Sequence, residues 1–361
     1  MNLSQITHHV TDPRDAKNQK YSLSSLLLIV FSAAVSGYDS VDDIVEFAQR
    51  KLTWLQQFTE LKRIPCAETL RHFLASVSAH ELTKGFEAFV SEVSEDIISI
   101  DGKTMRGSRN SSFDALHILS AWSQSKGITL AALKSEGKKN EIKTIPKVLD
   151  LIELKGATVT LDAMGCQREI AQDIVSRGGD YILQIKNNQK SLNTEIQAYF
   201  HKLQRDGFPE GSMVSFEEVD KGHGRIEERK VHQVLLSNWV EAGDQWAQAR
   251  SFIRVERTRI INNQETCEYS WYLSSLDLNA EKAARAIRGH WQIENNLHWQ
   301  LDVTLNEDRY SNNSAAETMA IIKRFCLNLL KTNDESKRRI KQRIVAAAVD
   351  DEYRAKILLS G

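Results

Sequence analysis

The chain has 361 residues, of which 41% are hydrophobic, 26% are charged and only four are proline. This composition is typical of an ordered globular protein of two or three domains and excludes collagen-like, low-complexity and wholly disordered chains. A formal net charge of −1 identifies no class of partner by itself. The four cysteines are far apart and include no CxxC pair, so neither a zinc site nor a disulfide scaffold is indicated.

No segment has the pattern of a membrane span or a signal peptide. The longest apolar stretch, Leu23–Val35, contains serines and is shorter than the roughly 20 apolar residues that a spanning helix needs. The first residues lack the basic-then-apolar order of a signal peptide. We therefore expect a cytoplasmic protein with no membrane partner.

Residues 1–94 predict a small helical domain with its own core. Apolar residues recur at spacings of three and four in Tyr21–Val35, Val41–Phe58 and Ala67–Ser76. Ser78 and Glu81 have the spacing of a capping box, which marks a further helix start.

At residue 95 the hydrophobic period changes from that of helices to that of strands. We expect strands at Asp96–Ile100, Ala115–Trp122 and Gly127–Leu133, a helix at Glu141–Leu154, a strand at Ala157–Leu161, a helix at Gln167–Ser176 and a strand at Asp180–Gln184. This order predicts an α/β fold with a partly parallel sheet covered by helices. Residues 192–280 interrupt the order with alternating strands rich in charged and aromatic residues, which predicts a β-rich insertion. The chain from Ala280 to Leu330 reads as helical again.

Three acidic residues stand out as candidates for chemistry. Asp101 and Asp162 close apolar strands, and open α/β sheets place their sites at that edge. Either aspartate alone is as typical of a turn or a helix cap, but two in one sheet, each followed by a glycine within three residues, favour a site. Glu294 shares a partly apolar helix face with His290 and Leu297.

Adjacent carboxylates repel one another unless a hard cation neutralises them. Mg²⁺ and Mn²⁺ prefer oxygen ligands, and two-metal sites promote phosphoryl displacement. A glycosidase would also use two carboxylates, and the acids alone do not decide between these chemistries. The eight Lys and Arg residues between Lys323 and Arg343 favour a phosphate substrate, although such a cluster is also typical of a solvated helix face.

Five segments carry a family resemblance. They are IDGKTMRGS (100–108), KNEIKTIPKVL (139–149), TLDAMGCQREIAQDIVSRGGDYILQIKNNQKSL (160–192), HGRIEER (223–229) and HWQIENNLHWQLDVTLNED (290–308). Together they resemble the DDE transposases of bacterial insertion sequences, most closely the H-repeat-associated group linked to Rhs elements. The helical N-terminal region also resembles the domain associated with that group, so the resemblance covers nearly the whole chain.

The resemblance implies a fold, an activity and a set of partners. It implies an associated domain at 1–94, a ribonuclease H-like catalytic domain at 95–335 with the β-rich insertion, and a basic helical tail at 336–361. It also implies that Asp101, Asp162 and Glu294 bind two Mg²⁺ or Mn²⁺ ions for DNA cleavage and strand transfer. The implied partners are the transposon's terminal inverted repeats and target DNA in the bacterial nucleoid, with a homodimer assembled on DNA. Two other interpretations stay open: a non-catalytic DNA-binding remnant, and a ribonuclease H-like nuclease without transposition.

Several further residues receive provisional roles. His298 and Asp302 are candidates for contacting and orienting the metal-binding Glu294. Trp291 and Trp299 are expected in the core. Candidates for contacting DNA are Lys186, Asn187, His223, Arg225, Lys337, Arg338 and Arg339. Related transposases often carry Tyr, Arg and Lys at seven before, four before and seven after the glutamate. In this sequence those positions are Ile287, His290 and Leu301.

Overall fold

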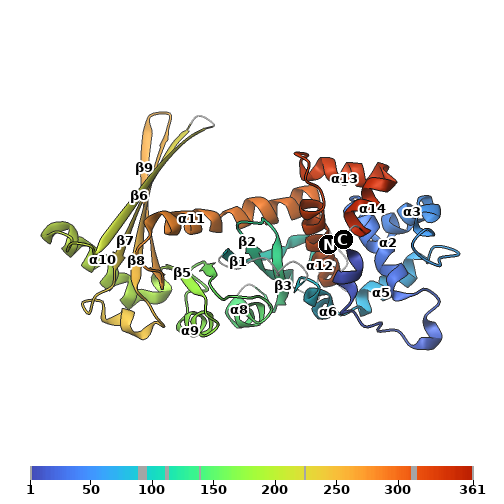
Figure 1. Ribbon diagram of the computed structural model, residues 1–361, viewed down its shortest axis with the longest axis horizontal. Coiled ribbons are helices and arrows are strands. Elements are labelled where there is room, and N and C mark those ends of the chain that lie inside the picture. The colour runs from blue at the N-terminus through green and yellow to red at the C-terminus, as the bar shows by residue number, and fades with distance from the viewer. Residues whose placement is uncertain are drawn as a thin grey trace. The chain divides into compact units, whose positions relative to one another are not determined.

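The computed structural model describes residues 2–87, 96–109, 114–137, 140–222, 225–309 and 315–359. The chain forms two compact units (Figure 1). The first comprises Met1–Glu92, Gly102–Ile152 and Ile293–Gly361, and the second comprises Val93–Asp101 and Glu153–Gln292. Among the described residues no helix is long and apolar enough to cross a membrane.

Helices from both ends of the chain pack together in the first unit. They are α1 (Leu3–Thr7), η1 (Ala16–Asn18), α2 (Leu23–Val35), α3 (Val41–Arg50), α4 (Leu52–Leu55), α5 (Ala67–Ser76), α6 (Ala79–Lys84), α12 (Ala316–Thr332), α13 (Ile340–Val349) and α14 (Asp351–Leu359). The predicted N-terminal helices are confirmed, with the stretch from Val41 divided into α3 and α4. The Ser78 side chain caps α6 by accepting the Glu81 N–H.

The core of this helical group lies between α2 and α12. Both helices are buried along most of their length, and the rings of Phe31 and Phe325 lie 6.2 Å apart. Phe86 stacks on Phe325 with ring centroids 3.9 Å apart. The helical N-terminal region and the C-terminal helices therefore share one core.

Nine strands form one mixed sheet in the order β3-β2-β1-β4-β5-β9-β8-β7-β6. The strands are β1 (Ile97–Met105), β2 (Leu116–Ser123), β3 (Thr129–Ser135), β4 (Thr158–Leu161), β5 (Asp180–Ile185), β6 (Met213–Gly222), β7 (Arg225–Leu235), β8 (Ser251–Ile261) and β9 (Gln264–Ser274). β1, β4 and β5 are parallel, and the helices α8 (Glu141–Leu149) and α9 (Arg168–Ser176) follow β3 and β4. The expected α/β class is confirmed.

The predicted β-rich insertion consists of two long antiparallel hairpins, β6–β7 and β8–β9, preceded by a helix that the hydrophobic pattern did not predict. That helix, α10 (Lys190–Asp206), buries Leu192, Ile196, Phe200 and Leu203 on one face. The sheet of the hairpins packs against α11 (Ala280–His290), which runs beside them in Figure 1. Their shared core includes Val231, Ile253 and Ile287.

Short turns and helical segments complete the chain. They are η2 (Arg106–Ser108), η4 (Asn187–Gln189), η5 (Glu241–Gln245), η6 (Glu294–His298), η7 (Gln300–Thr304) and η8 (Glu307–Arg309). The segments η6 and η7 are π-helical and continue the chain beyond α11.

Candidate active site

The parallel strands β1 and β4 place two aspartates side by side in the second unit. The register pairs Ile97 with Thr158 and continues to Ile100 with Leu161, so Asp101 and Asp162 are the next residue on each strand. Neighbouring strands lie about 4.8 Å apart, and register partners project from the same face. The two half-buried carboxylates therefore follow paired residues at the same edge of the sheet.

The strand that carries Asp101 is longer than predicted. We expected β1 to end at Ile100, but it continues to Met105. Its pairing with β4 extends to Ile100. The added residues are held by side chains of the first unit, because Thr104 and Lys103 both bind partners there. Asp162, in contrast, directly follows the last residue of β4.

Backbone donors orient the carboxylate of Asp162. Its Oδ1 accepts the N–H groups of Met164 at 2.9 Å and Gly165 at 3.2 Å. Gly165 is required in this turn because a Cβ there would fall within 3.0 Å of the Leu161 side chain. The loop is also tied to the chain beyond β5, since Asn188 donates to the carbonyl of Ala163 at 2.6 Å. Asp162 is thus held by a turn that leaves little rotational freedom.

His290 anchors the end of α11 to the strand that carries Asp162. Its Nδ1 lies 3.0 Å from the hydroxyl of Thr160, which also hydrogen-bonds to Ser99 of β1. Burial lowers the pKa of His290 to about 4, although the nearby charge of Asp162 opposes the shift. The imidazole is therefore neutral at neutral pH. Related transposases often have arginine at this position, whereas in this chain His290 hydrogen-bonds to Thr160 of the sheet.

Glu294 lies one turn beyond His290, in the first unit, where the helix becomes π-helical. π-Helical turns are rare and are frequent at functional sites. Leu297 and Leu301 are buried, as the predicted apolar face requires, whereas Glu294 itself is exposed. In the described part of the chain, no hydrogen bond or ion pair engages its carboxylate. The glutamate is therefore available to a ligand.

Asp101 and Asp162 belong to the second unit, whereas Glu294 belongs to the first. Over the described residues, no three His, Cys, Asp or Glu side chains gather closely enough to hold a metal ion. The donor chemistry of the aspartate pair nevertheless suits Mg²⁺ or Mn²⁺, because both ions prefer carboxylate oxygens and would relieve the repulsion between the two like charges.

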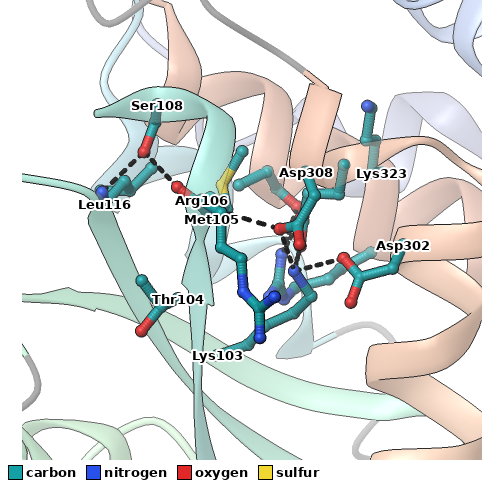
Figure 2. Close-up of polar contacts among 12 residues, drawn as sticks. Lys103, Thr104, Met105, Arg106, Ser108, Leu116, Asp302, Asp308 and Lys323 are labelled. Atoms are coloured by element: carbon teal, nitrogen blue, oxygen red, sulfur yellow. Dashed lines mark hydrogen bonds and ion pairs between the residues drawn. The ribbon is translucent and has the colours of Figure 1, made fainter. Parts of the chain in front are cut away.

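A buried lysine two residues after Asp101 is the largest feature that sequence reasoning missed. Lys103 is only 5% exposed, and its Nζ lies 2.6 Å from Asp302, 3.1 Å from Glu307 and 3.0 Å from Asp308. Figure 2 shows the lysine of β1 pointing at Asp302 and Asp308. Lys103 lies two residues after Asp101, so both side chains project from one face of β1. This spacing could have indicated from the sequence that the lysine lies near the aspartate.

Charge compensation within this cluster explains why the lysine stays protonated. Burial acts to lower the pKa of Lys103, but Glu307, Asp302 and Asp308 outweigh it and the pKa is raised. Burial likewise acts to raise the pKa of Glu307, which Arg324 and Lys103 overcome, so that its pKa is lowered. Arg324 donates to Glu307 at 2.7 Å, and both side chains are fully buried.

His298 and Asp302, expected beside Glu294, both belong to the surroundings of Lys103. Asp302 is ion-paired with the lysine. Burial lowers the pKa of His298 to about 3, and the charges of Arg324 and Lys103 add to the effect. His298 is therefore a neutral imidazole near the side chains of Arg324 and Lys103.

On the face of β1 opposite to Lys103, a second set of polar side chains is buried. His117 lies 2.6 Å from Glu141 through Nε2 and 2.8 Å from the hydroxyl of Thr104 through Nδ1. Gly102 leaves the space for this pair, because a Cβ there would come closer than 3.0 Å to both His117 Nε2 and Glu141 Oε1. Both faces of the strand beyond Asp101 are thus tied down by polar contacts.

The residues predicted to contact DNA fall into three groups. Lys186 and Asn187 are exposed and follow β5, at the same sheet edge as Asp162. Arg225 is exposed at the start of β7, whereas His223 lies outside the described residues. Lys337, Arg338 and Arg339 are exposed, and none forms an ion pair with an acid of the described chain.

The basic segment from Lys323 to Arg343 divides into structural and exposed cations. Lys323, Arg324 and Arg343 are buried and bind partners within the protein. Only the part around Lys337 to Lys341 presents its charge to solvent. Lys323, Arg324 and Arg343 therefore do not lie on a solvated helix face.

Two tryptophans of the helix that carries Glu294 also differ from expectation. Trp291 and Trp299 are 48% and 51% exposed, so the prediction that they lie in the core was wrong. The core side of this helix is filled by Ile287, Leu297 and Leu301 instead.

Comparison with known proteins identifies the family. Residues 93–329 match the Transposase DDE domain, and residues 5–90 match the DDE_Tnp_1-associated domain. The chain therefore belongs to the DDE transposase family of insertion sequences, as the motifs predicted.

Its relatives in Escherichia coli match it from end to end. The protein YbfL of strain K12 is 34% identical over 99% of this chain and 98% of its own. The H repeat-associated protein YhhI of strain K12, which carries a transposase name, is 33% identical with the same coverage. YncI of strain O157:H7, also named as a transposase, is 33% identical over 97% of this chain and 93% of its own.

We predict that Gly102→Ala destabilises the protein, because the added methyl group collides with the buried pair of His117 and Glu141. Overpacking of this kind costs about 1–3 kcal/mol of unfolding free energy, measurable by urea denaturation. Gly222→Ala is the matched control, since a Cβ there meets nothing within 4 Å. Equal stability of the two variants would contradict the packing described for Gly102.

Proposed function

We propose that the chain catalyses metal-dependent cleavage of phosphodiester bonds at the ends of its insertion sequence and transfers those ends to target DNA. The observation that carries the proposal is the pair Asp101 and Asp162, adjacent on parallel strands in a member of the DDE transposase family. Carboxylate oxygens are the ligands that Mg²⁺ and Mn²⁺ prefer, so two carboxylates at one sheet edge support a role in binding a cation.

We assign the third acidic position to Glu294. The nearby alternatives Asp302, Glu307 and Asp308 are all ion-paired with Lys103. Glu294 has no such partner in the described chain, and it follows His290, the anchor to β4, by one helical turn. Its availability supports the assignment.

In this proposal Asp101, Asp162 and Glu294 hold two Mg²⁺ or Mn²⁺ ions. Bound there, such ions lower the pKa of an attacking water or 3′-hydroxyl and neutralise charge on the phosphate. The protein's own part is to hold the carboxylates in place: the turn after Asp162 fixes its Oδ1, and His290 fixes the helix before Glu294. No covalent intermediate with the protein is needed.

The proposed partners are the terminal inverted repeats of the element and its target DNA, in the bacterial cytoplasm, with two copies of the chain assembled on DNA. Lys186 and Asn187 follow the strand beside Asp162 and would meet the backbone of DNA in the site. Arg225 would contact DNA from the start of β7, and His223 stays a predicted DNA contact. Lys337, Arg338 and Arg339 would bind phosphates electrostatically.

We predict that Asp101→Asn, Asp162→Asn and Glu294→Gln each abolish Mg²⁺-dependent cleavage of the element's terminal DNA while DNA binding persists. Each change removes one charged oxygen ligand without opening a cavity. Asp302→Asn should only reduce cleavage, because its carboxylate serves Lys103. The measurement is cleavage of labelled end DNA, with binding followed in parallel by fluorescence anisotropy.

Three results of this experiment would change the proposal. Wild-type rates in any of the three variants would remove that residue from the site. Binding without cleavage by the wild-type protein would favour a non-catalytic remnant. Cleavage without joining to a target would favour a nuclease that does not transpose.

We predict that replacing Lys337, Arg338 and Arg339 with Ala flattens the dependence of DNA affinity on salt. Each lost phosphate contact should change the slope of log affinity against log salt by about 0.9. The matched control replaces Arg50, Lys202 and Arg285, exposed cations that each pair with an acid four residues away. An identical slope in both triple variants would show that the segment makes no phosphate contact.

A further inference from the structure

We infer that Lys103 is a positioning residue that holds Glu294 in place through Asp302, an inference that rests on the proposed function. The helix that carries Glu294 has an anchor on each side of it. Four residues before the glutamate, His290 binds Thr160, which lies in the strand of Asp162. Eight residues after it, Asp302 binds Lys103, which lies in the strand of Asp101. The contact of His290 lies within the second unit, and the ion pair between Asp302 and Lys103 lies within the first, which also contains Glu294.

The direction of the lysine follows from the alternation of β1. Gly102 and Thr104 face His117 and Glu141 on one side of the strand. Lys103 consequently projects from the other side, which is also the side of Asp101, two residues and about 6.6 Å away along the strand. The ion pair thus joins the helix to the same face of β1 that presents the first aspartate.

Three carboxylates surround the single ammonium group of Lys103, which is more than are needed to neutralise one positive charge. Asp302, Glu307 and Asp308 surround it, while Arg324 separately neutralises Glu307. Glu307 and Asp308 lie in η8, beyond the π-helical turns, whereas Asp302 lies within η7. Glu307 and Asp308 therefore remain beside Lys103 when Asp302 is changed, and Asp302 is the contact that reaches the π-helical turns.

A π-helical segment needs such support more than an α-helix does. Its i→i+5 hydrogen bonds are rarely sustained, and here two such turns follow one another. Lys331 adds a contact at 3.3 Å to the carbonyl of Asn296 within the first turn. Asp302 makes the only ion pair between β1 and the two π-helical turns among the described residues, since Glu307 and Asp308 lie beyond these turns.

The experiment is a double-mutant cycle between Asp302→Asn and Glu294→Gln, read as Mn²⁺ affinity by electron paramagnetic resonance in the absence of DNA. Asp302→Asn retains two carboxylates around Lys103, so the protein should fold. We expect it to weaken Mn²⁺ binding by about 10- to 100-fold, the usual loss when a residue that orients a metal ligand is changed. In the Glu294→Gln background the same change should have no further effect, because the ligand that it positions is absent.

Two controls separate positioning from general damage. Lys323→Met removes another buried lysine of the same unit, which pairs with Asp39; it should lower the melting temperature and leave Mn²⁺ affinity unchanged. Lys103→Met should reproduce the loss of Mn²⁺ affinity seen in Asp302→Asn.

The outcomes distinguish this inference from the proposed function. If the wild-type protein neither binds Mn²⁺ nor cleaves DNA, the proposed function fails and the inference fails with it. If the wild-type protein does both and Asp302→Asn binds Mn²⁺ with unchanged affinity, the inference alone is wrong. Equal losses from Asp302→Asn in the presence and absence of Glu294 would also overturn it, because the effect would then not pass through the glutamate.

Discussion

The register between β1 and β4 is the constraint on which the proposed active site depends. Side chains alternate between the faces of a strand, so a slip of one residue would send Asp101 and Asp162 to opposite faces of the sheet. In the observed register they are neighbours, and their like charges repel one another in a half-buried setting. In the proposed function, a divalent cation bound between the two carboxylates would offset this repulsion.

Electrostatic balance beyond Asp101 supports the same strand from both faces. On one face Lys103 is buried among three acids, and on the other His117 and Glu141 fill the space that Gly102 leaves. Burying an unpaired ammonium is prohibitive, whereas a buried charge with partners close by is tolerated. These contacts continue β1 past the end of its pairing with β4, and so hold Asp101 inside a strand rather than at a frayed end.

Local patterns in the sequence predicted most of the fold and the aspartate pair, but not the long-range polar contacts. The bounds of α5 and the existence of the strands up to β5 follow from hydrophobic period, although β1 is longer than predicted, and Asp101 and Asp162 follow from their place after apolar runs. The pairing of Lys103 with Asp302 spans about two hundred residues of sequence, and no local spacing reports such a contact. Trp291 and Trp299 were assigned to the core on residue type alone, whereas Ile287 and Leu297 occupy the core face of that helix. The helix α10 was missed because its polar residues outnumber its apolar ones.

The most direct test of the account is the location of a metal ion in a crystal of the protein grown with Mn²⁺ and the DNA end of the element. Anomalous scattering from manganese should give a peak in contact with the carboxylates of both Asp101 and Asp162, and the peak should vanish in crystals of Asp162→Asn. A manganese peak beside Asp302 and Asp308, with none at the aspartate pair, would contradict the account.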